Sequence, residues 1–98
     1  MSDDSDVTVK DNAGENRYEA TLASGQLAGF AAYELHGGLV VFTHTEVDDA
    51  VEGQGVGSAL ARGALADVAE RDLKVRPLCP FIKEYIERHP EFQHLVEG

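Results

Sequence analysis

Residues 47–65 read VDDAVEGQGVGSALARGAL, with glycines alternating at Gly53, Gly55 and Gly57. Glycine lets a backbone approach a ligand closely and adopt dihedral angles that other residues avoid. After Gly57 the apolar residues recur at helical spacing, which predicts that the loop leads directly into a helix. The free N–H groups of a first helical turn, together with the helix dipole, form a site for a phosphate or pyrophosphate. The stretch therefore predicts a strand, an anion-binding loop and a helix, in that order.

Two well-known phosphate motifs fit this loop less well. A nucleoside-triphosphate loop needs Gly-Lys-Ser/Thr, and Gly57-Ser58 lacks the lysine. A dinucleotide fingerprint follows the first strand of a parallel unit, whereas this loop follows the fourth predicted strand of a meander. The glycine pattern alone is equally compatible with a turn that only starts a helix.

The residues on either side of the loop predict a small α+β domain. Apolar segments, some alternating with polar residues, are separated by turn-forming residues at 11–16, 23–26 and 36–38. The predicted strands are 7–11, 17–22, 27–35, 39–47 and 73–75, and the predicted helices follow Gly57 and span 81–89, before a short terminal turn. The order β-β-β-β-α-β-α indicates a mostly antiparallel sheet with two packed helices in one domain, residues 7–98. Residues 1–6 are expected to form a disordered acidic tail.

Charge and composition argue against several classes of protein. With 98 residues and a formal net charge of −10, the chain would repel nucleic acids and anionic membranes. Its acidic residues are spread along the chain, which favours an adaptation to high salt over a patch that attracts amines. No apolar run approaches the ~20 residues of a membrane helix, and the N-terminus lacks the apolar core of a signal peptide. A single cysteine, Cys79, allows no internal disulfide, no metal-ligand spacing is present, and we expect a cytoplasmic protein.

Together with its flanks, the loop resembles the acetyl-CoA-binding pattern of the GNAT superfamily of N-acetyltransferases, Arg/Gln-x-x-Gly-x-Gly/Ala. The matching flanks are His44-Thr45-Glu46-Val47 before the loop, and Leu78-Cys79-Pro80-Phe81, Tyr85 and Arg88-His89-Pro90-Glu91-Phe92 after it. This combination is similar to a compact GNAT-like family of about this length, and the similarity covers residues 39–96. One residue departs from the pattern: Glu52 stands where most members have Arg or Gln.

The resemblance implies that acetyl-CoA is the co-substrate and that no metal is needed. The pyrophosphate would lie on the loop residues Gly53, Gln54, Gly55, Val56, Gly57 and Ser58. In this family the strand before the loop diverges from the next strand, and the pantetheine arm of the cofactor lies in the gap. Here those strands would be 42–47 and 73–77, with backbone groups of Thr45, Glu46 and Val47 paired to the arm.

Four side chains are candidates for the chemical step. Side chains alternate along a strand, so His44 and Glu46 share one side, where either can accept a proton from an amine. A purely structural, hydrogen-bonded His44 fits the pattern equally well. The resemblance places Tyr85 where the family protonates the departing thiolate, although a core tyrosine on one helix face fits too. Cys79 is a candidate nucleophile or a buried, inert thiol, and we favour direct transfer without an acetyl-cysteine.

We therefore expect an N-acetyltransferase that moves acetyl from acetyl-CoA to a primary amine. A CoA-binding module without turnover is one alternative, and a small interaction domain whose glycines are only turns is another. The acceptor is expected to be a small-molecule or peptide amine. The two-helix insert that shapes acceptor pockets in larger GNAT enzymes is absent, so the acceptor site should be open or completed by a partner, in a monomer or a homodimer.

Overall fold

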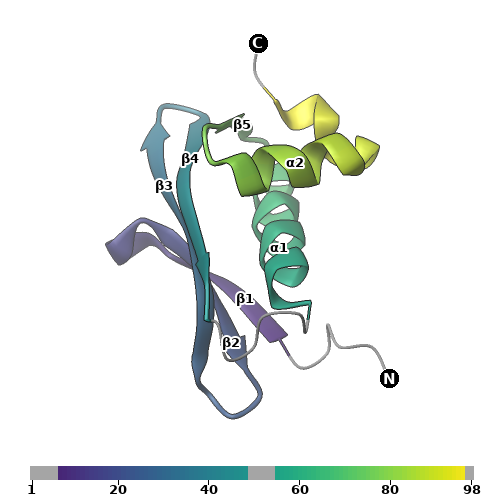
Figure 1. Ribbon diagram of the computed structural model, residues 1–98. Helices are drawn as coiled ribbons and strands as arrows, with labels where there is room; N and C mark the ends of the chain where they lie inside the picture. The colour runs from purple at the N-terminus through teal and green to yellow at the C-terminus, as the bar shows by residue number, and fades with distance from the viewer. Residues whose placement is uncertain (1–6, 49–54, 97–98) are drawn as a thin grey trace.

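The computed structural model describes residues 7–48 and 55–96, and its elements follow the predicted order. The strands are β1 (Val7–Asn12), β2 (Arg17–Leu22), β3 (Leu27–His36), β4 (Leu39–Val47) and β5 (Lys74–Pro77). The helices are α1 (Val56–Glu70) and α2 (Pro80–Arg88), with short 3-10 helices η2 (Ala13–Glu15) and η4 (Pro90–Leu95). The fold is the predicted α+β arrangement (Figure 1). The predicted acidic tail, residues 1–6, lies outside the described residues.

The sheet has the order β1-β2-β3-β4-β5, and its first four strands form an antiparallel meander. The tight turns lie where the sequence predicts them. Gly25, between β2 and β3, and Gly37, between β3 and β4, take left-handed φ angles of 94° and 60°. β5 pairs with β4 in parallel, which is possible because α1 carries the chain back along the sheet between them.

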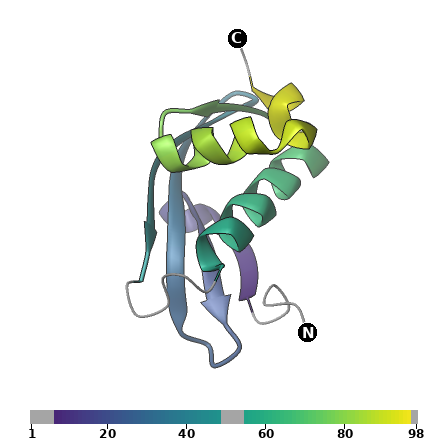
Figure 2. The ribbon, with the colours of Figure 1, turned by 45° about the vertical axis from the view of Figure 1, so that its right-hand side comes forward.

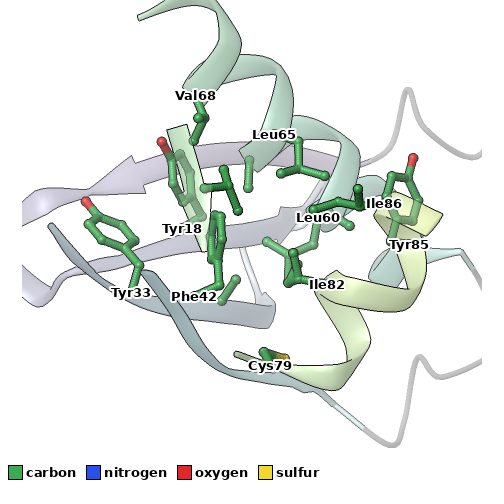
Figure 3. Packing of buried hydrophobic residues seen from close by; sticks show 14 of the residues in the cluster. Tyr18, Tyr33, Phe42, Leu60, Leu65, Val68, Cys79, Ile82, Tyr85 and Ile86 are labelled. Atoms are coloured by element: carbon green, nitrogen blue, oxygen red, sulfur yellow. The ribbon is translucent and has the colours of Figure 1, made fainter. Parts of the chain in front are cut away.

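Both helices pack against the same face of the sheet, as the two views in Figures 1 and 2 show. Apolar side chains from the sheet and from both helices fill the space between these layers (Figure 3). The largest fully buried ones include Phe42 and Val75 from the sheet, Leu60, Leu65 and Val68 from α1, and Ile82 from α2. Within the described chain no α-helix covers the opposite face, which is called the helix-free face below.

β4 and β5 pair over a short distance and then separate. Their last pair is Phe42 with Pro77, and the backbone N–H groups of Leu78 and Cys79 both donate to Phe42 O at 3.0 Å. The chain then enters α2 directly after Cys79. β4 meanwhile continues to Val47, so its second half pairs with β3 on one side and with no strand of the described chain on the other. A gap between the two strands is the result.

A β-bulge in β4 lies where this gap opens. Ala32 pairs with His44 and Tyr33 pairs with Phe42, so Thr43 is an extra residue on β4. Two successive side chains, Thr43 and His44, are therefore both exposed, whereas Phe42 is fully buried. The bulge thus turns His44 to the helix-free face directly beside the point where the strands separate.

A polar cluster fastens the second half of α1 to the first strands. Tyr18 Oη donates to Asp67 Oδ2 at 2.7 Å, and Tyr33 Oη donates to Asp11 Oδ1. Arg71 pairs with both carboxylates, at 3.1 Å from Asp11 and 3.0 Å from Asp67. Burial, and then the hydrogen bond to a carboxylate, raises the pKa of Tyr18 and raises that of Tyr33 to about 12. The cluster holds the scaffold on which the gap is built.

Several element boundaries differ from the sequence prediction by one or two residues, and β5 and α2 show the physical reasons. β5 is Lys74–Pro77 rather than 73–75, because Leu73 takes part in the turn that follows the end of α1 at Glu70. Asp72 has φ 62°, and Leu73 N donates to Val68 O at 3.0 Å, which is a helix-terminating arrangement. α2 begins one residue earlier than predicted because Pro80 suits the first helical position, where a missing N–H costs nothing.

Candidate functional site

The start of α1 forms the first part of the site. Gly55 caps the helix in a left-handed conformation, with φ 83° and ψ 7°. A Cβ atom on Gly55 would meet no atom of the described chain within 4 Å, so the space in front of this turn is open. The side chain of Val56 is buried, and only its backbone can face a ligand. The loop residues Glu52, Gly53 and Gln54 lie outside the described part of the chain.

Gly57 serves the packing of the two helices. A Cβ atom on Gly57 would lie 2.8 Å from Phe81 Cζ, so the absence of a side chain makes room for the Phe81 ring. The next residue, Ser58, lines a shallow pocket of about 120 Å³ together with residues of α2, namely Phe81, Glu84, Tyr85, Arg88 and His89. The two described glycines of the loop therefore have different roles. Gly55 takes the left-handed backbone angles of the turn, and Gly57 leaves room for α2 to pack against the start of α1.

The gap between β4 and β5 forms the second part. Alternate residues of an antiparallel strand turn their N–H and C=O groups toward the partner strand. Asp48 N donates to Ala28 O of β3 at 2.7 Å. This bond shows that the backbone groups of Asp48, and of every second residue before it on β4, face β3. The backbone groups of Thr45 and Val47 consequently point away from β3, into the gap that opens after Phe42. Those of Glu46, which were also predicted to pair with the arm, face β3 instead. They offer hydrogen-bond donors and acceptors to an extended ligand.

Cys79 lies at the closed end of this gap. Its side chain is buried, and Sγ donates to Thr45 Oγ1 at 3.2 Å. Cys79 is also the N-cap residue of α2, and Figure 3 shows it between the sheet and the start of that helix. The structure thus brings the predicted residues Cys79 and Thr45 into contact across the strand separation.

His44 and Glu46 lie together on one side of β4, as predicted, and they face away from the helices. His44 Nε2 donates to Glu46 Oε2 at 2.7 Å, and the two side chains are 57% and 62% exposed. A carboxylate only accepts hydrogen bonds, so this contact places a proton on Nε2 and leaves Nδ1 of the neutral ring as an acceptor. The ring of Phe30 on β3 lies 6.2 Å from the His44 ring. The pair is an exposed proton acceptor beside the gap.

Tyr85 lies near the other end of α2, in the pocket that Ser58 lines. Its ring is buried and stacks on His89, with ring centroids 3.9 Å apart and an interplanar angle of 14°. His89 Nδ1 donates to Tyr85 O at 2.8 Å, which caps the C-terminal end of the helix. Cys79 and Tyr85 are six positions apart, about 9 Å along a helix axis. Figure 3 shows the Tyr85 hydroxyl pointing away from Cys79.

The predicted residues therefore meet as three pairs rather than as one cluster. The pairs are Thr45 with Cys79, Ser58 with Tyr85, and His44 with Glu46. Two aromatic neighbours of these pairs were not predicted: Phe30 beside His44, and Phe81 against Gly57. The contacts of Phe30 with His44 and of Phe81 with Gly57 each join segments far apart in the sequence, so no local sequence pattern predicts them.

The described side chains offer no metal site, since no three His, Cys, Asp or Glu residues among them are grouped as ligands. Within residues 7–48 and 55–96, no helix combines the length and the apolar character needed to cross a bilayer.

Known proteins share both the sequence pattern and the fold. Residues 17–95 match the family described as GCN5-related N-acetyl-transferase. Protein NATD1 of Gallus gallus and of Mus musculus are each 42% identical over 64 residues, which cover 64% of this chain and 58% of theirs. Protein NATD1 of Xenopus tropicalis is 31% identical over 96 residues, which cover 97% of this chain and 88% of its own.

The similarity extends to a solved structure. The NMR solution structure of a GCN5-like protein from Staphylococcus aureus matches with a TM-score of 0.70 at 26% identity, over 96% of this chain and 91% of that one. The chain spans little more than half the length of the chicken and mouse relatives, 58%. The family match, in contrast, covers residues 17–95, from the start of β2 to the end of η4. The chain therefore belongs to the GCN5-related N-acetyltransferase family.

Proposed function

We propose that this chain transfers an acetyl group from acetyl-CoA to a primary amine. The observation that carries the proposal is the gap between β4 and β5, into which the backbone of β4 presents groups that no described strand pairs. α1, the next element after β4, begins with an open glycine turn. A ligand with amide groups along one arm and phosphates at the far end suits this arrangement, and acetyl-CoA has that form.

The residues of the site fit such a ligand. The backbone groups of Thr45 and Val47 that face the gap offer partners to the amides of the arm. The N–H groups of residues 55–58 and the positive end of the α1 dipole suit the phosphates. Because a Cβ atom at Gly55 would stand in open space, a phosphate can approach the backbone there without displacing a side chain.

Acetyl-CoA would supply the acetyl group as an activated thioester. His44 accepts the proton of the amine at Nδ1, and Glu46 stabilises the imidazolium through its contact with Nε2. The departing sulfur leaves as a thiolate and takes a proton from solvent, because Tyr85, the donor expected from the family resemblance, lies with Ser58 beside the proposed phosphate groups. Acetyl moves directly to the amine in this proposal, and Cys79 remains a thiol that shapes the closed end of the gap.

Two glycines provide a matched test of the binding site. Gly55 and Gly25 have φ angles of 83° and 94°, and a Cβ atom at either would meet nothing of the described chain within 4 Å. Alanine at either position should cost about 1–3 kcal/mol of backbone strain, so the two variants should lose similar stability. Only Gly55→Ala should weaken acetyl-CoA binding in calorimetry. Equal affinities of the two variants for acetyl-CoA would indicate that its phosphates do not bind at Gly55.

Turnover is tested with acetyl-CoA and a simple primary amine, n-butylamine, by release of the CoA thiol and formation of the amide. Amine-dependent release supports the proposal. Saturable acetyl-CoA binding without turnover of any amine would indicate a binding module instead. The intact mass of the protein after incubation with acetyl-CoA alone distinguishes direct transfer from transfer through Cys79. An acetyl adduct on Cys79 that an amine removes would show that the reaction has two steps.

A further inference from the structure

Two side chains close the gap between β4 and β5. Thr45 lies on β4 and Cys79 lies directly before α2, and Cys79 Sγ donates to Thr45 Oγ1 at 3.2 Å. Val47, two residues after Thr45, packs against the core, so the side chains of Thr45 and Val47 both point to the helix side of the sheet. Cys79 is buried and Thr45 is half-buried. We name Thr45 and Cys79 the end wall.

Backbone hydrogen bonds hold the end wall in place. The N–H groups of Leu78 and Cys79 both donate to Phe42 O at 3.0 Å. The carbonyl oxygen of Cys79 accepts from Lys83 N, also at 3.0 Å, in the first turn of α2. Because both backbone groups of Cys79 are engaged, its sulfur cannot retreat from the gap without breaking bonds that connect the sheet to α2.

The packed core lies behind the end wall. Phe42 and Ile82 are both 0% exposed and belong to the same hydrophobic cluster as Cys79 (Figure 3). Protein interiors are close-packed, and an inserted methylene forces neighbouring side chains off their preferred rotamers. The end wall therefore has little room to yield to a longer ligand.

The proposed position of the cofactor directs its acyl group to the end wall. A Cβ atom on Gly57 would lie 3.6 Å from Val47 Cγ2, so Val47 marks the end of the gap next to the proposed phosphate groups. Thr45, two residues earlier, contacts Cys79 at the closed end. An arm that starts at the phosphates and runs along β4 consequently reaches the end wall with its thioester.

We propose that Thr45 and Cys79 restrict the acyl group of the cofactor to two carbons, an inference that rests on the acetyl transfer proposed above. The acetyl methyl group contacts the γ-methyl of Thr45 and the sulfur of Cys79, and a third carbon would overlap with these atoms. The two residues determine specificity by their shape. They take no part in moving protons or in forming bonds.

The affinities for acetyl-CoA and propionyl-CoA, measured by calorimetry, test this restriction because the two cofactors differ by one methylene. One methylene in an apolar pocket changes discrimination by about 10–200-fold. We expect propionyl-CoA to bind at least about tenfold more weakly than acetyl-CoA. Equal affinities would overturn the inference, since the acyl chain would then extend away from the end wall.

Variants that change the size of the end wall test the two residues directly. Cys79→Ala removes the sulfur and Thr45→Ala removes both γ atoms, so each should bring the affinity for propionyl-CoA close to that for acetyl-CoA. Thr45→Val keeps the shape and removes the hydrogen bond to Cys79, and it should therefore keep the preference for acetyl-CoA. An equal loss of this preference in Thr45→Val and Thr45→Ala would contradict selection by shape.

Thr43 supplies the control for these variants. It lies on the same strand as Thr45, but its side chain is exposed and donates to Ala32 O at 3.5 Å. Thr43→Ala should leave the preference for acetyl-CoA unchanged. A gain in affinity for propionyl-CoA cannot arise from partial unfolding, so Cys79→Ala and Thr45→Ala remain informative even if they lower the thermal midpoint. Failure of both variants to bind propionyl-CoA more tightly would overturn the inference.

The same titrations separate this inference from the proposed function. The absence of acetyl-CoA binding would refute both. Acetyl-CoA binding without turnover of n-butylamine would refute the transfer, whereas the preference for acetyl-CoA over propionyl-CoA would still be measured and should still be at least about tenfold. Turnover of n-butylamine with equal kcat/KM for the two cofactors would refute the size restriction alone.

Discussion

Replacing His44 by glutamine should remove the proton acceptor of the proposed reaction and leave the fold intact. The chain contains a matched control, because His36 pairs with Glu34 at the end of β3 in the same way. The distances are 2.7 Å for His44–Glu46 and 3.0 Å for His36–Glu34, with side-chain exposures of 57% and 62% against 63% and 65%. His36→Gln therefore makes the same chemical change at a similar exposed pair away from the gap.

The two variants should have similar stability but very different activity. An exposed ion pair contributes about 0–1 kcal/mol, so either substitution should lower the thermal midpoint only slightly. Loss of a general base typically lowers turnover by about 10²–10⁴-fold. We expect His44→Gln to lower kcat by that factor and His36→Gln to leave it close to that of the unmodified protein.

The assay is release of the CoA thiol at saturating acetyl-CoA, with thermal unfolding and acetyl-CoA calorimetry on both variants. Affinity for acetyl-CoA should stay the same in both, because neither side chain lies in the proposed binding groups. If His44→Gln retains full turnover, or if both variants lose it equally, the assignment of His44 as the proton acceptor is wrong.

Tyr85→Phe keeps the ring and its stacking and removes only the hydroxyl, and turnover should stay close to that of the unmodified protein because Tyr85 lies beside Ser58 rather than in the gap. A fall of about 10²–10⁴-fold with unchanged acetyl-CoA affinity would instead identify Tyr85 as the proton donor. Cys79→Ala should retain substantial activity, and loss of both activity and an acetyl adduct would indicate a covalent route. The pKa of Tyr33 is about 12 in the folded protein, above its ordinary 10.0, so the folded state keeps a proton that the unfolded chain loses. The free energy of unfolding should therefore fall as the pH rises from about 10 to 12, and Tyr33→Phe should reduce that fall in urea titrations; identical slopes would contradict this. If the acidic surface is an adaptation to salt, the thermal midpoint should rise in molar KCl, and a flat or falling midpoint would count against it.

The sheet and its hairpins were predictable because their signals are local. The turns at Gly25 and Gly37 lie between alternating segments, and glycine takes the left-handed angles there without strain. The start of α1 followed from the change of hydrophobic period after the glycine-rich loop. The shared side of His44 and Glu46 followed from strand alternation, and the hydrogen bond between them confirms it.

The relative placement of the candidate residues depends on contacts between distant segments and was not predictable. The bulge at Thr43 appears only when β3 and β4 are aligned, yet it determines that His44 points away from the helices. Cys79 and Tyr85 are only six positions apart in the sequence. α2 nevertheless crosses α1 so that Tyr85 lies with Ser58, whereas Cys79 lies at the gap. The Tyr18–Asp67 contact likewise joins residues 49 positions apart.

Titration of isotope-labelled protein with acetyl-CoA, followed by NMR, tests the proposed binding mode most directly. The backbone amides of Thr45, Val47 and residues 55–58 should shift together and saturate at one ligand per chain, because the β4 edge and the start of α1 would bind the same molecule. Free CoA, or an acetyl-CoA analogue without a hydrolysable thioester, should produce the same shifts at residues 55–58, where the phosphates are proposed to bind. The absence of saturable shifts, or shifts that leave both the β4 edge and residues 55–58 unchanged, would contradict acetyl-CoA binding in the gap.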